Sequence, residues 1–375
     1  MAGLYIHIPF CASRCIYCGF YSTTRLDLRQ QYVDAVCREM EMRTVFGGFA
    51  ADSPSASSVY LGGGTPSQLT IAQLHQLFDT IYIYKVEQNA EITIEMNPDD
   101  VTPEYAAVLT ELGINRVSMG AQTFDDQRLR FLHRRHTAPQ VFEAVRTLRD
   151  VGIRNISVDL MYGFPGETLN DWQRDIDAVL SLDVKHLSAY CLMVEEGTEL
   201  YRMMYKGNGS LLCDEEMERA MYEQLIDRLT AAGYEHYEIS NFARPGYRSR
   251  HNSSYWHDVP YIGLGAAAHS YDGLCRSWNV SDIRQYIDTI NHGELPCERE
   301  ILDDDTRYND RIATALRTCD GLDLATLSDR HRRYCIQEAQ PFIKDELLSL
   351  TDNRLVLTRC GLFVSDMVMS ALVWA

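Results

Sequence analysis

Residues 11–18 read Cys11-Ala-Ser-Arg-Cys15-Ile-Tyr-Cys18, which brings three thiols into one short loop. They follow the apolar run Leu4–Ile8, which is typical of a strand. Zinc sites need four ligands and usually combine two Cys-x-x-Cys pairs, and the sequence has no second pair. Iron–sulfur clusters take cysteine thiolates, and three of them leave one iron open to another ligand. The spacing therefore favours a [4Fe–4S] cluster on Cys11, Cys15 and Cys18 over a zinc site or three unliganded thiols.

Outward from this stretch, short apolar runs alternate with amphipathic stretches as far as about residue 240. The predicted strands are Leu4–Ile8, Val59–Leu61, Ile92–Met96, Arg116–Met119, Ile156–Leu160 and Leu187–Tyr190, with Tyr237–Ile239 as a weaker seventh. The predicted helices are Arg29–Phe46, Ile71–Ile83, Pro103–Leu112, Ala138–Val151, Leu169–Leu182 and Asp214–Ala232. Gly113, Gly152 and Gly233 follow helical stretches, where a left-handed C-cap residue is needed. This alternation predicts an α/β fold, a partial (β/α) TIM-like barrel, with a doubly wound sheet as the alternative.

Composition limits the classes of function. The chain has 375 residues, 46% of them hydrophobic and 23% charged, which predicts a packed globular protein. A formal charge of −18 argues against nucleic-acid binding. We expect no transmembrane segment and no signal peptide, since no apolar run has the required length or flanks. Eleven cysteines without an export signal indicate reduced thiols in the cytoplasm, and the eight outside the triplet are predicted to be small core residues.

The pattern changes near residue 290. Three helical stretches follow, then two short apolar runs split at Gly361: Asp305–Cys319, Leu324–Tyr334, Gln337–Ser349, Leu355–Thr358 and Leu362–Val364. Three helices and a hairpin resemble a winged helix. Residues 297–375 hold 10 Lys+Arg and 14 Asp+Glu, a net −4 that suits a cap or protein contact better than DNA. The predicted domains are a barrel over 1–240, a connecting region over 241–295 and the winged-helix-like domain over 296–375. Residues 47–58 and 206–210 are predicted surface loops.

The spacing Cys-x3-Cys-x2-Cys, with the aromatic Tyr17 before the third cysteine, resembles the radical S-adenosylmethionine (SAM) superfamily. The wider stretch Tyr5-Ile-His7-Ile-Pro9-Phe10-Cys11 resembles a narrower branch. That branch holds the oxygen-independent coproporphyrinogen III oxidases (HemN) and the HemW-type heme chaperones. The resemblance extends over nearly the whole chain and implies a radical SAM core, a [4Fe–4S] cluster and SAM bound at its open iron.

The resemblance also implies a set of SAM contacts. Gly63, Gly64 and Thr65 lie in a glycine-rich turn whose backbone can approach a polar ligand, although a simple tight turn has the same residues. Glu95 ends the third strand, where barrel folds form their sites, and a solvated or paired carboxylate is the alternative. The remaining implied contacts are Tyr5, Tyr17, Gln122, Arg134, Asp159 and Met193. Arg134 is predicted on the helix after the fourth strand, where a surface charge is the alternative.

Two departures separate the oxidases from the chaperones. The oxidases that the chain resembles carry a further cysteine two residues after the third ligand, where this chain has Phe20. They also have a long N-terminal extension, whereas Cys11 has only ten residues before it. Both features favour a heme chaperone over an oxidase that decarboxylates propionate side chains. A cluster-bearing interaction protein without a porphyrin role is the third hypothesis.

His251-Asn-Ser-Ser-Tyr255-Trp256 matches an HNxxYW motif of the chaperone branch. Imidazole ligates heme iron, and Tyr and Trp offer flat apolar faces, so His251, Tyr255 and Trp256 are candidate heme contacts. A buried, hydrogen-bonded histidine with two core aromatics is the alternative. His257 and His269 are rival ligands, and His7 is predicted to be a core residue or to support the cluster loop.

The resemblance implies several partners. Heme is the cargo, heme-acceptor proteins receive it, and respiratory enzymes are one candidate class of acceptor. The cluster needs an electron donor. A homodimer is one of the oligomeric states that the sequence leaves open.

Overall fold

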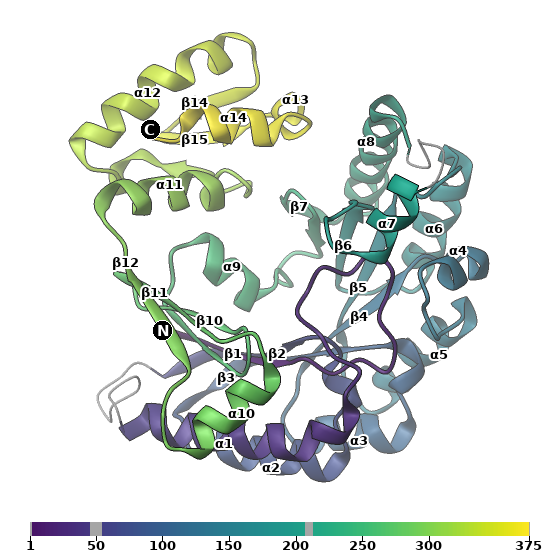
Figure 1. Cartoon of the computed structure of the whole chain (residues 1–375). Coiled ribbons are helices and arrows are strands. Elements are labelled where there is room, and N and C mark those ends of the chain that lie inside the picture. Colours follow the sequence, from purple (N-terminus) through teal and green to yellow (C-terminus); the bar gives the residue numbers. More distant parts are fainter. Residues whose placement is uncertain (1, 46–54, 207–212, 375) are drawn as a thin grey trace.

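Six parallel strands in chain order form the centre of one curved sheet in the computed structural model, which describes residues 2–45, 55–206 and 213–374. Each strand pairs with the next along the chain, as Figure 1 shows. The strands are β1 (Ala2–Ile8), β2 (Ala56–Gly63), β3 (Val86–Met96), β4 (Arg116–Gln122), β5 (Asn155–Tyr162) and β6 (His186–Cys191). This order confirms the predicted partial barrel. The predicted loop residues Ala56–Ser58 belong to β2, while residues 46–54 and 207–210 lie outside the described residues.

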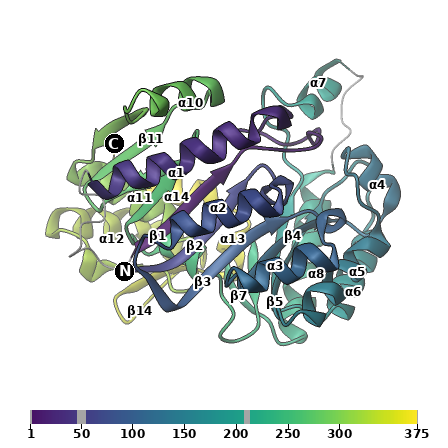
Figure 2. The ribbon, with the colours of Figure 1, turned by 90° about the horizontal axis from the view of Figure 1, so that it is seen from below.

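Helices cover the outer face of the sheet, and Figure 2 shows the first three crossing it. They are α1 (Arg29–Val45), α2 (Ile71–Ile81), α3 (Pro103–Glu111), α4 (Asp126–Phe131), α5 (Ala138–Asp150), α6 (Leu169–Ser181), α7 (Glu199–Lys206) and α8 (Glu215–Ala231). Gly113, Gly152 and Gly233 have φ values of 76°, 97° and 85°, which confirms the predicted left-handed helix ends. The short helices α4 and α7 were not predicted, because six to eight residues show too little periodicity.

The sheet continues beyond the six strands on both sides. Next to β1 come β9 (Tyr261–Leu264), β10 (His269–Tyr271), β11 (Cys275–Asn279) and β12 (Cys297–Ile301), and next to β6 come β8 (Asn241–Ala243) and β7 (Glu235–Glu238). The predicted seventh strand exists as β7, but it runs antiparallel to β8 at an edge and does not continue the parallel series. The region 241–295 thus contributes strands to the same sheet, together with α9 (Arg250–Trp256) and α10 (Ile283–Asn291).

A second apolar core defines the C-terminal domain, which is drawn in yellow-green above α9 in Figure 1. Its elements are α11 (Asp304–Ala315), β13 (Leu322–Asp323), α12 (Asp329–Lys344), β14 (Leu348–Thr351), β15 (Arg354–Leu357), α13 (Arg359–Leu362) and α14 (Ser365–Leu372). The prediction of two helices over 324–349 is wrong, because a single helix α12 spans most of that region. The predicted strand Leu362–Val364 is also wrong. The hairpin partner of β15 is β14, and residues 359–362 are helical.

The two faces of the sheet differ in polarity. Leu4, Ile6 and Ile8 of β1 are fully buried in the main core, and Tyr5 and His7 alternate with them. The concave side holds hydrogen-bonded polar groups, such as Ser157 Oγ and His186 Nδ1, which lie 2.7 Å apart. The sheet therefore offers polar ligands an interior that is lined with donors and acceptors.

The prediction that eight cysteines are core residues holds only in part. Cys37, Cys275 and Cys335 are buried, and Cys191 and Cys213 are partly buried. The remaining three are exposed: Cys297, Cys319 and Cys360. All eleven are free thiols.

Candidate functional site

A cavity of about 420 Å³ opens at the carboxyl ends of the parallel strands. Its size lies in the range of small-molecule sites, and parallel barrels form their sites at this end. The residues that line it come from the loop after β1, from the ends of β2 to β6 and from the turn after α4. Twelve of the predicted cofactor residues are among them: Cys11, Cys15, Tyr17, Cys18, Gly63, Gly64, Thr65, Glu95, Gln122, Arg134, Asp159 and Met193.

The three predicted cluster cysteines line one side of this cavity. The Sγ atom of Cys11 lies 3.5 Å from Thr65 Oγ1, and Arg134 Nη1 donates to Cys15 Sγ over 3.7 Å. Burial raises the pKa of the Cys11 and Cys18 thiols. Metal binding would therefore have to displace protons from them.

The thiols suit a ligand larger than one ion. Within the described ranges, no three His, Cys, Asp or Glu side chains gather closely enough to hold a single metal ion. Cysteines that serve a cluster bind different iron atoms and so stand further apart. Three free thiols around one cavity therefore fit a three-cysteine cluster better than a mononuclear zinc site.

The glycine turn after β2 brings backbone against the cysteine loop. A Cβ atom on Gly64 would lie 2.7 Å from the carbonyl carbon of Pro9, just before Cys11. Gly63 has a φ of 118°, and a Cβ there would lie 2.5 Å from the His7 ring. Both positions thus require glycine for the fold, besides leaving backbone open to a ligand.

Glu95 faces the cavity from the end of β3. Its carboxylate accepts hydrogen bonds from Tyr60 Oη at 2.8 Å and from the Gly63 amide at 3.0 Å. Burial raises its pKa to about 7, against the opposing effect of the Tyr60 hydrogen bond. The Glu95 carboxyl therefore changes its protonation state near neutral pH.

Asp159 lies across the cavity on β5. Its neighbours in register are Gly120 of β4 and Ser188 of β6. Burial raises its pKa to about 6, although the Ser188 hydroxyl, Arg116 and Arg134 act in the opposite direction. Two carboxyl groups of raised pKa thus share one cavity, which suits a cationic or hydroxyl-bearing ligand.

The sequence predicts Arg134 on a helix, but in the structure Arg134 lies in the turn after α4. Its Nη2 donates to Asn97 Oδ1 at 2.8 Å and to the Gly120 carbonyl. The buried Nε has no partner within the described residues. A buried guanidinium with a spare donor fits an acceptor group on a ligand, such as a carboxylate.

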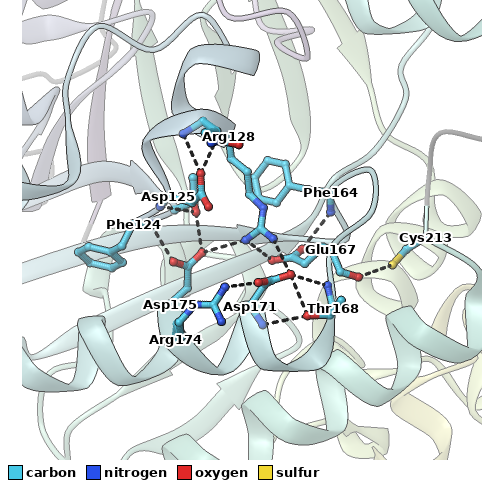
Figure 3. A network of polar contacts seen from close by, with 12 residues as sticks. Phe124, Asp125, Arg128, Phe164, Glu167, Thr168, Asp171, Arg174, Asp175 and Cys213 are labelled. Atoms are coloured by element: carbon cyan, nitrogen blue, oxygen red, sulfur yellow. Dashed lines mark hydrogen bonds and ion pairs between the residues drawn. The ribbon is translucent and has the colours of Figure 1, made fainter.

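A charged network, drawn in Figure 3, holds the loops after β4 and β5 in place. Arg128 of α4 lies 3.0 Å from Glu167 and 3.2 Å from Asp171. Asp175 of α6 accepts hydrogen bonds from Thr123 Oγ1 at 2.6 Å and from the Phe124 amide at 2.8 Å. The segment that follows Gln122 is therefore fixed to α6.

The predicted heme residues lie away from the cavity. His251 is 1% exposed, and its ring nitrogens are bonded to Ser58 Oγ at 2.9 Å and Tyr255 Oη at 2.8 Å. It stacks on Tyr60, with ring centroids 5.0 Å apart. In this conformation the imidazole has no free nitrogen for iron, as in the alternative interpretation of a satisfied core histidine.

Two other predicted residues, Tyr5 and Trp256, also pack against aromatic rings. Tyr5 stacks on His251 at 6.3 Å, and its hydroxyl lies 3.0 Å from His7 Nδ1 instead of lining the cavity. Trp256 packs edge-on against Tyr237 at 5.9 Å. This aromatic cluster is connected to the cavity through Tyr60, whose hydroxyl also donates a hydrogen bond to Glu95.

Sequence reasoning missed several residues that line the cavity. They are Asn97, Ser118, Gly120, His133, Arg135, Tyr190 and Glu195. The inward alternation of the strands could have identified Ser118, Gly120 and Tyr190. The others lie in loops, where sequence gives no register.

Known protein families and proteins resemble this chain along most of its length. The Radical SAM superfamily profile matches residues 5–179, and the HemN C-terminal domain profile matches residues 302–364. The chain is 34% identical to the heme chaperone HemW of Bacillus subtilis, over 99% of both chains. It is 35% identical to heme chaperone HemW of Mycobacterium tuberculosis, over 99% of this chain and 94% of the relative.

A solved structure has a similar fold. The coproporphyrinogen III oxidase HemN of Escherichia coli, described as a radical SAM enzyme, superposes with a TM-score of 0.86. The alignment covers 99% of this chain and 90% of that one, at 23% sequence identity. At this identity the match shows a shared fold.

Proposed function

Because this chain belongs to the HemW family of the radical SAM superfamily, we propose that it is a heme chaperone, which binds heme and transfers it to acceptor proteins. The observation that carries the proposal is the similarity to proteins named heme chaperone along practically the entire chain. The match to the oxidase, at 23% identity, concerns the fold. Phe20, where the oxidases carry a cysteine, also supports a chaperone.

The family implies a [4Fe–4S] cluster and SAM, and the cavity residues fit both. Cys11, Cys15 and Cys18 would hold the cluster. Gly63, Glu95 and the spare donor of Arg134 are suited to the polar groups of SAM. When bound, the pair supplies one-electron chemistry, for which an electron donor would be needed. The residues of this chain bind the two groups, orient them and control the protonation of Glu95 and Asp159.

The cellular setting belongs to the same proposal. None of the helices in the described part of the chain has the length and apolar character to cross a membrane. Eleven free cysteines suit the reducing cytoplasm, where we expect the protein to act. Respiratory enzymes as acceptors and a homodimer remain predictions.

The test compares two activities of one preparation. Protein with an anaerobically reconstituted cluster is loaded with ferric heme and mixed with an apo heme protein, and transfer is followed by the absorbance of the acceptor. The same preparation is incubated with coproporphyrinogen III, SAM and a reductant, and porphyrin products are measured. Heme transfer without decarboxylation supports the proposal. Decarboxylation at enzymatic rates without heme transfer would establish the oxidase alternative.

A further inference from the structure

The cavity has an apolar rim that faces solvent. Phe20 is 73% exposed and Met193 67% exposed, and Tyr190 beside them is 44% exposed. All three line the cavity, whereas the cluster cysteines are only partly exposed. Exposed apolar side chains gathered at the mouth of a polar cavity mark a binding surface. The rim is thus open to a second, flat apolar ligand above the residues that suit the cluster and SAM.

His133 presents an imidazole at the same mouth. It lines the cavity, its side chain is 52% exposed, and its backbone φ is 62°. This left-handed conformation ends helix α4, with the His133 amide donating to the Arg130 carbonyl and the Arg134 amide to the Leu129 carbonyl. Its ring lies 3.9 Å from Glu199 and has no hydrogen bond within the described residues. The contact with Glu199 involves Nδ1, which leaves Nε2 without a partner among the described residues and available to a metal.

The other candidate histidines are less suited. The His251 ring is buried with both nitrogens bonded. His257 has one ring nitrogen 2.7 Å from the Ser253 carbonyl and the other 3.3 Å from Asp320. His269 is exposed beside Trp278 but lies outside the cavity. Of these four histidines, His133 alone lines the cavity beside the apolar rim and has a ring nitrogen, Nε2, without a partner among the described residues.

Charge at the mouth also suits heme, whose propionates are anionic. Arg14 is exposed, lines the cavity and has no ion pair within the described residues. Arg135, by contrast, is paired with Asp99 and Asp100. Glu195 lies against Gly19 on the rim. Its negative charge would repel the propionates and so direct them toward Arg14.

We infer that heme binds across the mouth of the cavity, with His133 as its axial ligand and Phe20 and Met193 against the porphyrin. Arg14 would pair with a propionate. This inference rests on the proposed function and adds the location and the ligand of the cargo.

The test uses His133→Gly in protein with a reconstituted cluster. Glycine adopts a φ of 62° without strain, so this variant should fold at least as well as the parent protein. Ferric heme is titrated anaerobically, with the heme-free cluster protein as the spectral reference, and the axial ligand is identified by electron paramagnetic resonance. We expect heme affinity to fall at least about tenfold, as losses of ligand support typically do, and the histidine-ligated signal to disappear.

The controls are His269→Ala and His251→Phe, which should leave heme affinity within about twofold of the parent. Phe20→Ser and Arg14→Ser should weaken binding while His133 ligation persists. Unchanged heme affinity and spectrum in His133→Gly would overturn the inference, as would loss of the histidine signal in either control. These outcomes leave the proposed function intact. It fails instead if the parent protein binds no heme.

Discussion

At the scale of single residues, the site combines groups whose protonation or pairing depends on a bound ligand. Two thiols have pKa values raised by burial, Glu95 and Asp159 have raised pKa values, and Arg134 keeps a buried donor without a partner. An empty cavity would leave these groups costly to bury. Binding of a cluster and a polar ligand would satisfy them.

Replacing any one of the three cluster cysteines by alanine should abolish the cluster, because the loop has no spare thiol. Protein reconstituted anaerobically should contain roughly four irons and four sulfides per chain. Cys11→Ala, Cys15→Ala and Cys18→Ala should each lose most of this iron and the broad visible absorbance. The exposed Cys297 provides the control, since Cys297→Ala should keep the full content. Stoichiometric zinc in the parent protein would refute the assignment.

The affinity for SAM should fall as pH decreases below about 7. SAM carries positive charges, which favour the ionised form of Glu95, and burial raises the pKa of this carboxyl to about 7. A single linked proton gives at most about a tenfold loss of affinity per pH unit. Calorimetric titrations from pH 8 to 6 should show this slope, and Glu95→Gln should flatten it. An equal slope in the variant would show that another group titrates.

The same shift acts on the stability of the ligand-free protein. The folded pKa of Glu95 lies above its ordinary value of 4.5, so the folded state holds this proton more tightly than the unfolded chain. Its contribution to stability is complete below about 4.5 and is lost as pH rises through about 7. The ligand-free site thus opposes folding at neutral pH.

At the scale of elements, α6 serves as the anchor for the loop between β4 and α4. Asp175 receives two hydrogen bonds from that loop and also lies 4.0 Å from Arg128. The loop continues through α4 to His133 and Arg134, both at the cavity. The positions of His133 and Arg134 at the cavity therefore depend on α6, a helix that does not itself line the cavity.

Asp175→Ala should destabilise the protein by about 2–4 kcal/mol, because it leaves the Thr123 hydroxyl and the Phe124 amide without their acceptor. Urea unfolding would measure the loss. The control is Asp177→Ala, whose exposed carboxylate on the same helix pairs with Arg228. We expect that variant to lie within about 0.5 kcal/mol of the parent. Similar losses in both variants would contradict the anchor role.

At the scale of the whole molecule, α9 joins the barrel to the C-terminal domain. Its first amides, of Arg250 and His251, donate to Glu91 of β3, and His251 contacts Ser58 of β2. Asp258, two residues past its end, lies 2.8 Å from Arg311 of α11 in the C-terminal domain. In this structure the His251–Trp256 segment thus packs parts of the fold together.

The buried ion pair between Glu238 and Arg317 should stabilise the protein more than the exposed pair between Asp227 and Arg359. Glu238 is 2% exposed and accepts from Arg317 at 2.9 Å and from the Ser240 amide at 2.9 Å. Glu238→Ala should cost about 2–4 kcal/mol and separate the unfolding of the two domains, measured by calorimetry. Asp227→Ala removes the exposed pair with Arg359 and should cost less than about 1 kcal/mol. A single unshifted transition in Glu238→Ala would disprove this coupling.

The sequence by itself determined the features that local chemistry encodes. Three closely spaced thiols, alternating βα periodicity and glycines after helices predicted the cluster loop, the parallel strands and the left-handed turns. It did not determine which polar residues reach the cavity, because that depends on strand register and on loops. Arg134, which the sequence predicts on a helix, lies in a turn at the cavity in the folded chain. Tyr5, which the sequence predicts as a cofactor contact, does not line the cavity. Tertiary structure also buried His251 between Ser58 and Tyr60, which lie nearly two hundred residues away in the chain. A motif fixes side-chain types, whereas burial and the partners of each nitrogen arise only when distant segments pack together.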